Sequence, residues 1–206
     1  MTITLPTILS IIRLFAGFLI LLGFLLLARP EADILAFVIF VSAAITDFID
    51  GYIARKFNLV SELGKILDSI ADKILVIMAW VIIITYYEFN SWIILPIGLI
   101  IFRELFISGL REYLASKSLS LQVTFIAKLK TTLQMITISL TFFSGIIVDG
   151  SSSLTTFLLQ PVAGSGTTLV EMACIVLIWL SAIQTIYSGW EYFKTALGLM
   201  GTKNDG

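Results

Sequence analysis

The sequence predicts an all-α, polytopic membrane protein with six transmembrane helices. Of its 206 residues, 58% are hydrophobic and 13% are charged, whereas about 25% of the residues of a soluble domain are charged. The apolar residues gather in runs close to the roughly 20 residues that a helix needs to cross the hydrocarbon core of a bilayer. We therefore expect one integral-membrane domain over residues 1–206, with a loose tail over residues 195–206.

The apolar runs are separated by short polar segments, and each is long enough for one helix. Residues 149–168 are rich in glycine, serine and threonine and carry no basic residue, so we expect an outward-facing loop there. The expected spans cover residues 8–28, 34–53, 66–86, 92–112, 125–148 and 169–194.

Basic residues give the orientation, because loops rich in lysine and arginine stay on the cytoplasmic side of a membrane. Arg29 alone lies clearly toward the other side. With an even number of spans, both termini are then cytoplasmic. The N-terminus shows neither a basic leader nor a small-residue cleavage motif, so we expect a bacterial inner membrane. The basic residues assigned to the cytoplasmic side are Arg55, Lys56, Lys65, Arg111, Lys117, Lys128, Lys130, Lys194 and Lys203.

Composition also excludes several kinds of chemistry. The chain has no histidine, which removes Ser-His-Asp triads and histidine-ligated zinc. Cys174 is the single cysteine, so neither a disulfide framework nor a cysteine metal site is possible within one chain. A net charge of −1 provides no general attraction for nucleic acid.

Four aspartates, two glycines and an arginine stand together in residues 47–72, with the spacing D-x2-D-G-x2-A-R-x8-G-x3-D-x3-D. An α-helix turns by about 100° per residue, so residues three, four and eight apart share a face. We expect two neighbouring helices to turn four carboxylates toward each other. The residues on one face of the first helix are Asp47, Asp50, Gly51 and Ala54, and those on one face of the second are Gly64, Asp68 and Asp72.

This acidic segment predicts a divalent-metal site that holds a diphosphate. An ionised side chain within a bilayer costs about 2.5–3.5 kcal/mol, and a divalent cation offsets that cost because it binds carboxylate oxygens and neutralises their charge. Glycine in a helix costs about 1 kcal/mol relative to alanine. Gly51 and Gly64 therefore indicate close approach, either of a ligand or of a neighbouring helix. Arg55 could pair with a phosphate or with an acidic neighbour, or it could be exposed to solvent.

The segment resembles the signature of the CDP-alcohol phosphotransferases at every defining position. The resemblance implies six transmembrane helices, a homodimer, and transfer of a phosphatidyl or similar group from a CDP-linked donor to an alcohol, with release of CMP. It further implies that Asp72 is the general base. The implied ligands of Mg²⁺ or Mn²⁺, with two ions expected, are Asp47, Asp50, Asp68 and Asp72, and the implied contacts of the CDP moiety are Gly51, Ala54, Arg55 and Gly64.

A second polar cluster lies in residues 103–135 and carries more cations than anions. Glu104 and Glu112 can partner at most two of its basic residues, and cations within a membrane need partners. The surplus predicts a site for the phosphate of an anionic acceptor, although cytoplasmic anchoring alone would also account for part of it. The residues expected to bind the acceptor phosphate are Arg103, Arg111, Lys128 and Lys130.

This cluster resembles one subfamily, the phosphatidylglycerophosphate synthases. The resemblance rests on R-E-x-x-I-S-x-x-R-E at residues 103–112, K-x-K-T-x-x-Q at residues 128–134 and LPTILSIIR at residues 5–13. It implies CDP-diacylglycerol as the donor and sn-glycerol 3-phosphate as the acceptor. Residues 136–206 carry little that is specific.

Other functions remain open at this point. Within the family, the acceptor could be phosphatidylglycerol, as in cardiolipin synthesis, or inositol phosphate or serine. A cation transporter is a different class that also uses intramembrane aspartates. The sequence shows no inverted repeat, and the outer halves of its expected spans are almost wholly apolar, so an enzyme is favoured.

Overall fold

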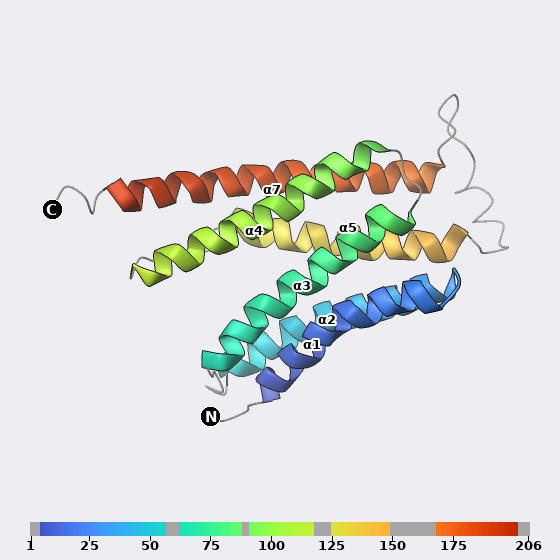
Figure 1. The fold of residues 1–206 in the computed structure, drawn as a ribbon, viewed down its shortest axis with the longest axis horizontal. Coiled ribbons are helices and arrows are strands. Elements are labelled where there is room, and N and C mark those ends of the chain that lie inside the picture. Colours follow the sequence, from blue (N-terminus) through green and yellow to red (C-terminus); the bar gives the residue numbers. More distant parts are fainter. Residues whose placement is uncertain (1–4, 57–61, 88–90, 118–124, 149–167, 202–206) are drawn as a thin grey trace. The chain divides into compact units, whose positions relative to one another are not determined.

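The computed structural model describes residues 5–56, 62–87, 91–117, 125–148 and 168–201. These residues form six α-helices and one short 3-10 helix, which confirms the predicted all-α class and number of helices, and each predicted span overlaps one helix (Figure 1). The helices are α1 (Leu5–Leu26), α2 (Glu31–Lys56), α3 (Glu62–Tyr86), η1 (Ser91–Ile93), α4 (Ile94–Ser116), α5 (Phe125–Val148) and α7 (Leu169–Gly201).

Two of these helices are long and apolar enough to cross a membrane by length and composition, namely residues Thr7–Leu26 of α1 and Leu169–Met200 of α7. Because α7 continues through Gly201, residues 195–201 of the expected tail are helical. The loop expected at 149–168 lies outside the described residues except for Thr168.

The start of α7 is fixed by a reciprocal cap. The backbone N–H of Thr168 donates to Glu171 Oε2 at 2.8 Å, and the backbone N–H of Glu171 donates to Thr168 Oγ1 at 3.2 Å. This Thr-x-x-Glu capping box satisfies two amide groups that have no partner within the helix. The cap therefore defines where the last helix begins.

The chain divides into two compact units. The first comprises residues 1–88 and 138–172, and the second comprises residues 89–137 and 173–206. That all 206 residues act as one catalytic domain stays a prediction.

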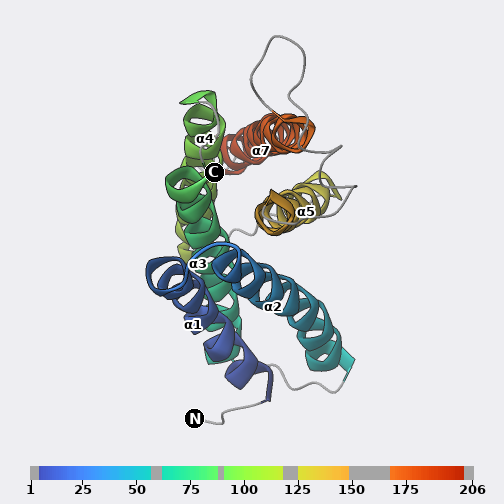
Figure 2. The same cartoon turned by 90° about the vertical axis from the view of Figure 1, so that its right-hand side faces the viewer.

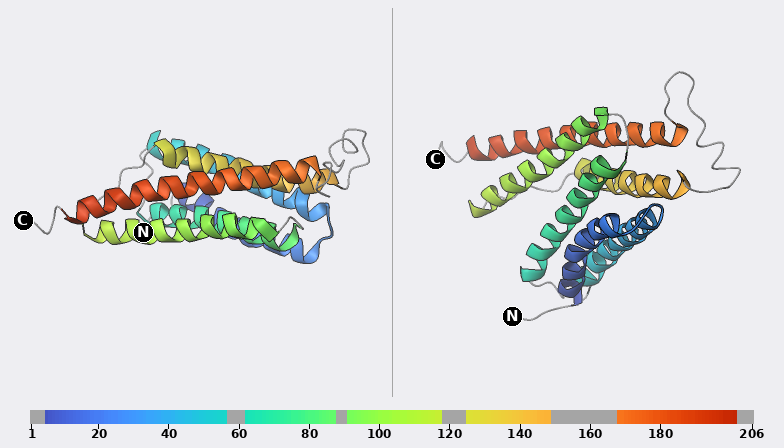
Figure 3. Two further views of the ribbon diagram at one scale, coloured as in Figure 1. Left: turned by 90° about the horizontal axis from the view of Figure 1, so that it is seen from above. Right: turned by 45° about the vertical axis from the view of Figure 1, so that its right-hand side comes forward.

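In the first unit, α1 packs alongside α2 and α3, as Figures 2 and 3 show from several directions. Phe142 of α5 lies at the centre of an aromatic core in this unit, with its ring centroid 6.1 Å from those of Phe24 and Phe40 and 6.4 Å from that of Tyr87. These rings hold α1, α2 and the second half of α5 together through apolar contact.

A partly buried ion pair lies in the same unit at the start of α2. Asp33 is fully buried and accepts hydrogen bonds from Arg29 Nε at 2.7 Å and from the Tyr87 hydroxyl at 2.5 Å. A Cβ atom at Gly145 would clash with both Arg29 and Asp33, so this glycine leaves the room that the pair requires. Along α2, Asp33 and Asp47 are 14 residues apart, which corresponds to about 21 Å at 1.5 Å per residue.

The second unit has an interior that is polar as well as apolar. Thr137 of α5 bonds Ser181 of α7 at 2.9 Å, and Gln134 Nε2 donates to Thr185 Oγ1 at 2.8 Å. Many large apolar side chains instead face outward in both units, including Phe15, Phe102 and Trp190. Polar groups inside and apolar groups outside are the distribution expected of helices surrounded by lipid.

Candidate active site

Three of the four predicted aspartates come together in the first unit. Asp47 stands on α2, and Asp68 and Asp72 stand one turn apart on α3. Each offers one carboxylate oxygen, and these three oxygens lie within 4.8 Å of one another. The helical spacing of the sequence motif therefore translates into a cluster built from two helices.

Arg13 of α1 lies at the centre of this cluster. Its Nη1 atom lies 2.7 Å from Asp47 Oδ1, and the same nitrogen lies 2.9 Å from Asp68 Oδ1 and 2.8 Å from Asp72 Oδ1. The arginine side chain is only 2% exposed. Ser10, one turn earlier on α1, donates a further hydrogen bond to Asp68 at 3.2 Å. A single buried guanidinium thus orients all three carboxylates.

Close packing of α1 on α3 places Arg13 there. A Cβ atom at Gly17 would lie 3.4 Å from the Cα of Leu75 and 3.5 Å from Cγ of Met78, so the helix backbones approach closely at this point. Sequence reasoning gave Arg13 no site role. The signal that could have found it was a charged residue inside the first apolar run, where a partner is obligatory.

The donor set fits a hard divalent cation. The three converging side chains offer only carboxylate oxygens, which Mg²⁺ and Mn²⁺ prefer. With Arg13 included, the four side chains sum to a net charge of −2, from three negative charges and one positive charge. The residues therefore leave negative charge for a cation to neutralise.

The other predicted residues of the motif are placed by backbone only. Asp50, Gly51, Ala54 and Arg55 lie in the last turns of α2, and their side chains are outside what the structure describes. Gly64 lies in the first turn of α3 and is half-buried. Their predicted roles stay predictions.

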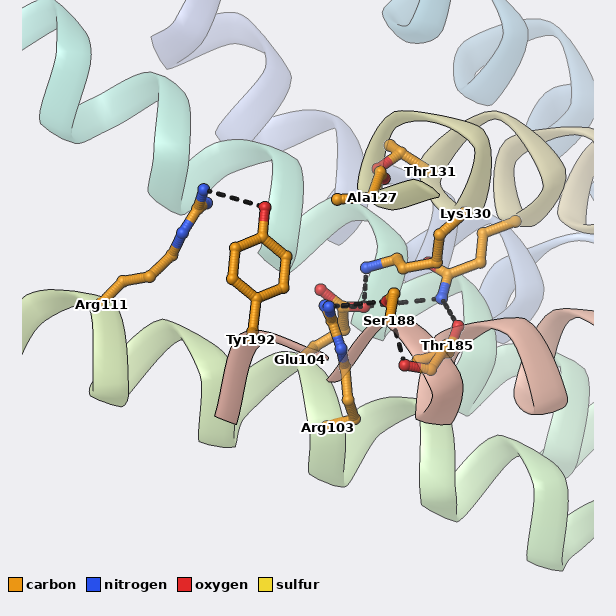
Figure 4. A network of polar contacts seen from close by, with 10 residues as sticks. Arg103, Glu104, Arg111, Ala127, Lys130, Thr131, Thr185, Ser188 and Tyr192 are labelled. Atoms are coloured by element: carbon orange, nitrogen blue, oxygen red, sulfur yellow. Dashed lines mark hydrogen bonds and ion pairs between the residues drawn. The ribbon is translucent and has the colours of Figure 1, made fainter. Parts of the chain in front are cut away.

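The second unit gathers predicted cations around a single carboxylate (Figure 4). Arg103 of α4 and Lys130 of α5 are both buried. Glu104 pairs with Lys130 Nζ and lies 3.6 Å from Arg103 Nη1, and Gln134 Nε2 donates to the same carboxylate at 3.5 Å. One carboxylate is thus shared between two buried cations.

The two remaining predicted cations are exposed. Arg111 Nη2 donates to the Tyr192 hydroxyl at 3.5 Å, and its guanidinium carbon lies 5.1 Å from the centroid of that ring. Lys128 lies two residues before the buried Lys130 on α5 and faces outward. The structure therefore brings Arg103, Arg111 and Lys130 into one network and leaves Lys128 at its edge.

The network also contains residues of α7 that sequence reasoning missed. Arg103 Nη2 donates to Ser188 Oγ at 2.8 Å, and the guanidinium carbon of Arg103 lies 5.7 Å from the ring centroid of Tyr192. Both α7 residues are buried. The available signal was the placement of Thr185, Ser188 and Tyr192 three and four residues apart, which puts their polar groups on one face of an apolar helix.

The chain is similar to known proteins over most of its length. The family model described as CDP-alcohol phosphatidyltransferase matches residues 3–197. A relative from Cereibacter sphaeroides, named CDP-diacylglycerol–glycerol-3-phosphate 3-phosphatidyltransferase, is 40% identical over 94% of this chain and 96% of its own length. A relative with the same name from Rickettsia bellii is 40% identical over 92% of this chain and 93% of its own length. Another, from Salmonella typhimurium, is 34% identical over 96% of this chain and 97% of its own length.

Proposed function

The chain belongs to the CDP-alcohol phosphatidyltransferase family, and from this premise we propose that it transfers the phosphatidyl group of CDP-diacylglycerol to sn-glycerol 3-phosphate. The products are phosphatidylglycerophosphate and CMP, on the route to anionic phospholipids. Two relatives that carry this activity in their names are each 40% identical to this chain over more than nine tenths of its length. Family membership makes the chain a transferase and sets the cation-transporter alternative aside.

We propose that the acidic cluster holds the metal. Asp47, Asp68 and Asp72 would bind Mg²⁺ or Mn²⁺, with Asp50 one turn along α2 as a fourth ligand and two ions in all. When bound, the metal supplies electrostatic stabilisation of the diphosphate charge and of the leaving CMP. The convergence of three carboxylate oxygens within 4.8 Å is the observation that carries this assignment.

Asp72 is the proposed general base. It accepts the proton of the attacking hydroxyl of glycerol 3-phosphate while that oxygen forms a bond to the phosphorus attached to diacylglycerol. The bond from this phosphorus to the CMP oxygen breaks, so CMP departs. Arg13, 2.8 Å from Asp72 Oδ1, fixes the direction of the carboxylate. Gly51, Ala54, Arg55 and Gly64 are the proposed contacts of the CDP moiety.

The network of the second unit is the proposed site for the acceptor phosphate. Arg103, Arg111 and Lys130 contribute three positive charges, and Glu104 contributes one negative charge. The remaining +2 suits a phosphate dianion, which binds strongly to guanidinium and ammonium groups. Lys128 would attract the acceptor from the edge of the network. A neutral or zwitterionic alcohol would leave this positive charge without a matching anion.

The proposal extends to the setting of the enzyme. We place it in a bacterial inner membrane as a homodimer, with both termini and the active site on the cytoplasmic side. The outward-facing apolar side chains, such as Phe15 and Phe102, support lipid around the helices. A cytoplasmic site would let the water-soluble acceptor enter and CMP leave, while the acyl chains stay in the bilayer.

The acceptor is tested by a panel of alcohols. Purified protein in lipid vesicles receives CDP-diacylglycerol, Mg²⁺ and one acceptor at a time, and CMP release is measured. Glycerol 3-phosphate should support turnover, whereas serine and inositol phosphate should not. Turnover with phosphatidylglycerol but not with glycerol 3-phosphate would instead establish cardiolipin synthesis, the closest alternative.

A further inference from the structure

Two adjacent residues of α7 lie against the side chain of Arg103. Ser188 contacts the guanidinium, and Gly189 lies beside the chain that carries it. Arg103 Nη2 donates to Ser188 Oγ at 2.8 Å, and Ser188 is fully buried. A Cβ atom at Gly189 would lie 2.9 Å from Arg103 Cγ and 3.1 Å from its Nε. Ser188 therefore holds the guanidinium, and Gly189 leaves space for the arm that carries it.

The hydroxyl of Ser188 is itself oriented. It donates to the backbone carbonyl of Thr185 at 3.1 Å, which commits its hydrogen and turns its lone pairs toward Arg103. A hydroxyl oxygen is a neutral acceptor. It can fix the position of a guanidinium without cancelling the positive charge. A carboxylate would also fix the guanidinium, but it would cancel that charge.

The positive charge of Arg103 is only partly compensated by its anionic neighbour. Glu104 lies 3.6 Å from Arg103 Nη1 and is shared with Lys130. The aromatic face of Tyr192, 5.7 Å from the Arg103 guanidinium carbon, adds a weaker cation–π attraction. Arg103 is thus held in place mainly by uncharged groups of α7, and its charge remains available to an anion.

We propose that Ser188 and Gly189 are positioning residues that set Arg103 for the phosphate of the acceptor. This inference rests on the proposed function, because it assigns the acceptor phosphate to Arg103. It gives the last helix, which carried no recognisable motif, a part in acceptor selection. Neither residue touches the acceptor; both act through the arginine.

The test compares two glycine substitutions on the same helix. Gly189→Ala places a methyl group against Arg103, whereas a Cβ atom at Gly198 meets nothing within 4 Å. Both changes replace a helical glycine by alanine, so they have the same effect on helix propensity. Gly189→Ala should raise the KM for glycerol 3-phosphate about tenfold, the size expected for a lost hydrogen bond to a charged group. The KM for CDP-diacylglycerol should stay within about twofold. Gly198→Ala should change neither constant.

Ser188→Ala gives an independent test that adds no bulk. It should raise the acceptor KM by a similar factor, and it should have no further effect in an Arg103→Gln background. If Gly189→Ala fails to fold, this pair of variants decides the question. A merely structural serine would instead lower the melting temperature without separating the two KM values.

The outcomes distinguish the inference from the function on which it rests. If Arg103→Gln leaves the acceptor KM unchanged, the assignment of the acceptor phosphate to Arg103 is wrong. If Arg103→Gln raises that KM but Ser188→Ala and Gly189→Ala behave like Gly198→Ala, the positioning role is wrong while the assignment stands.

Discussion

Arg13 should determine both the stability of the acidic cluster and its response to metal. Arg13→Met retains a long, unbranched side chain but removes the guanidinium that contacts Asp47, Asp68 and Asp72 at 2.7–2.9 Å. The net charge of the cluster then changes from −2 to −3. Three carboxylates whose oxygens lie within 4.8 Å lose their common partner and repel one another.

The expected cost follows from burial. Removing one partner of a buried ion pair costs about 3–5 kcal/mol, but the three aspartate side chains are 38%, 47% and 35% exposed. Water screens part of their charge, so we expect a loss of about 2–3 kcal/mol. For a chain of this size, 1 kcal/mol corresponds to a shift in melting temperature of about 2–4 °C. The variant should therefore melt about 5–10 °C below the wild type.

The assay is thermal unfolding of the purified protein with EDTA and with Mn²⁺. Mn²⁺ should raise the melting temperature of Arg13→Met by more than that of the wild type, because a divalent cation offsets the added negative charge. Arg29→Met is the matched control, since it also breaks an arginine–aspartate pair, the one with Asp33. An equal shift with Mn²⁺ in all three proteins would show that Arg13 does not control the charge that the metal meets in the acidic cluster.

Three further predictions concern single residues. Asp72→Asn should lower kcat for CMP release by about 10²–10⁴-fold, the contribution of a general base, while the protein stays folded; near-normal release would contradict the assignment. Arg111→Ala should raise the KM for glycerol 3-phosphate far more than the KM for CDP-diacylglycerol, and equal effects would place Arg111 elsewhere. Gly145→Ala should destabilise the protein by about 1–3 kcal/mol through overpacking against Arg29 and Asp33, as measured by thermal unfolding with both KM values as controls.

Helical periodicity was sufficient to predict the acidic cluster. Asp68 and Asp72 are four residues apart and fall on one face of α3, where the structure places them beside Asp47 of α2. The all-α class followed from apolar runs of the length of a membrane span, and the described parts of the chain form six α-helices. Both inferences depend on local spacing, which a sequence states directly.

Contacts between distant helices could not be read in the same way. Arg13 is separated by 34 to 59 residues from its three aspartates, and Arg103 by 85 residues from Ser188. The burial of individual side chains could not be predicted from the sequence either. Lys128 and Lys130 were predicted to act alike, but two residues correspond to about 200° around a helix, so Lys130 is buried against Glu104 while Lys128 is exposed.

Phosphatidyl transfer is tested most directly by following labelled glycerol 3-phosphate into lipid. Purified protein in vesicles receives CDP-diacylglycerol, radiolabelled glycerol 3-phosphate and Mg²⁺, and lipid-soluble label is measured together with CMP. We predict that label and CMP appear in equal amounts, and that both disappear with EDTA or in Asp72→Asn. CMP release without label in the lipid, or transfer that persists after removal of divalent metal, would contradict metal-dependent phosphatidyl transfer to this acceptor.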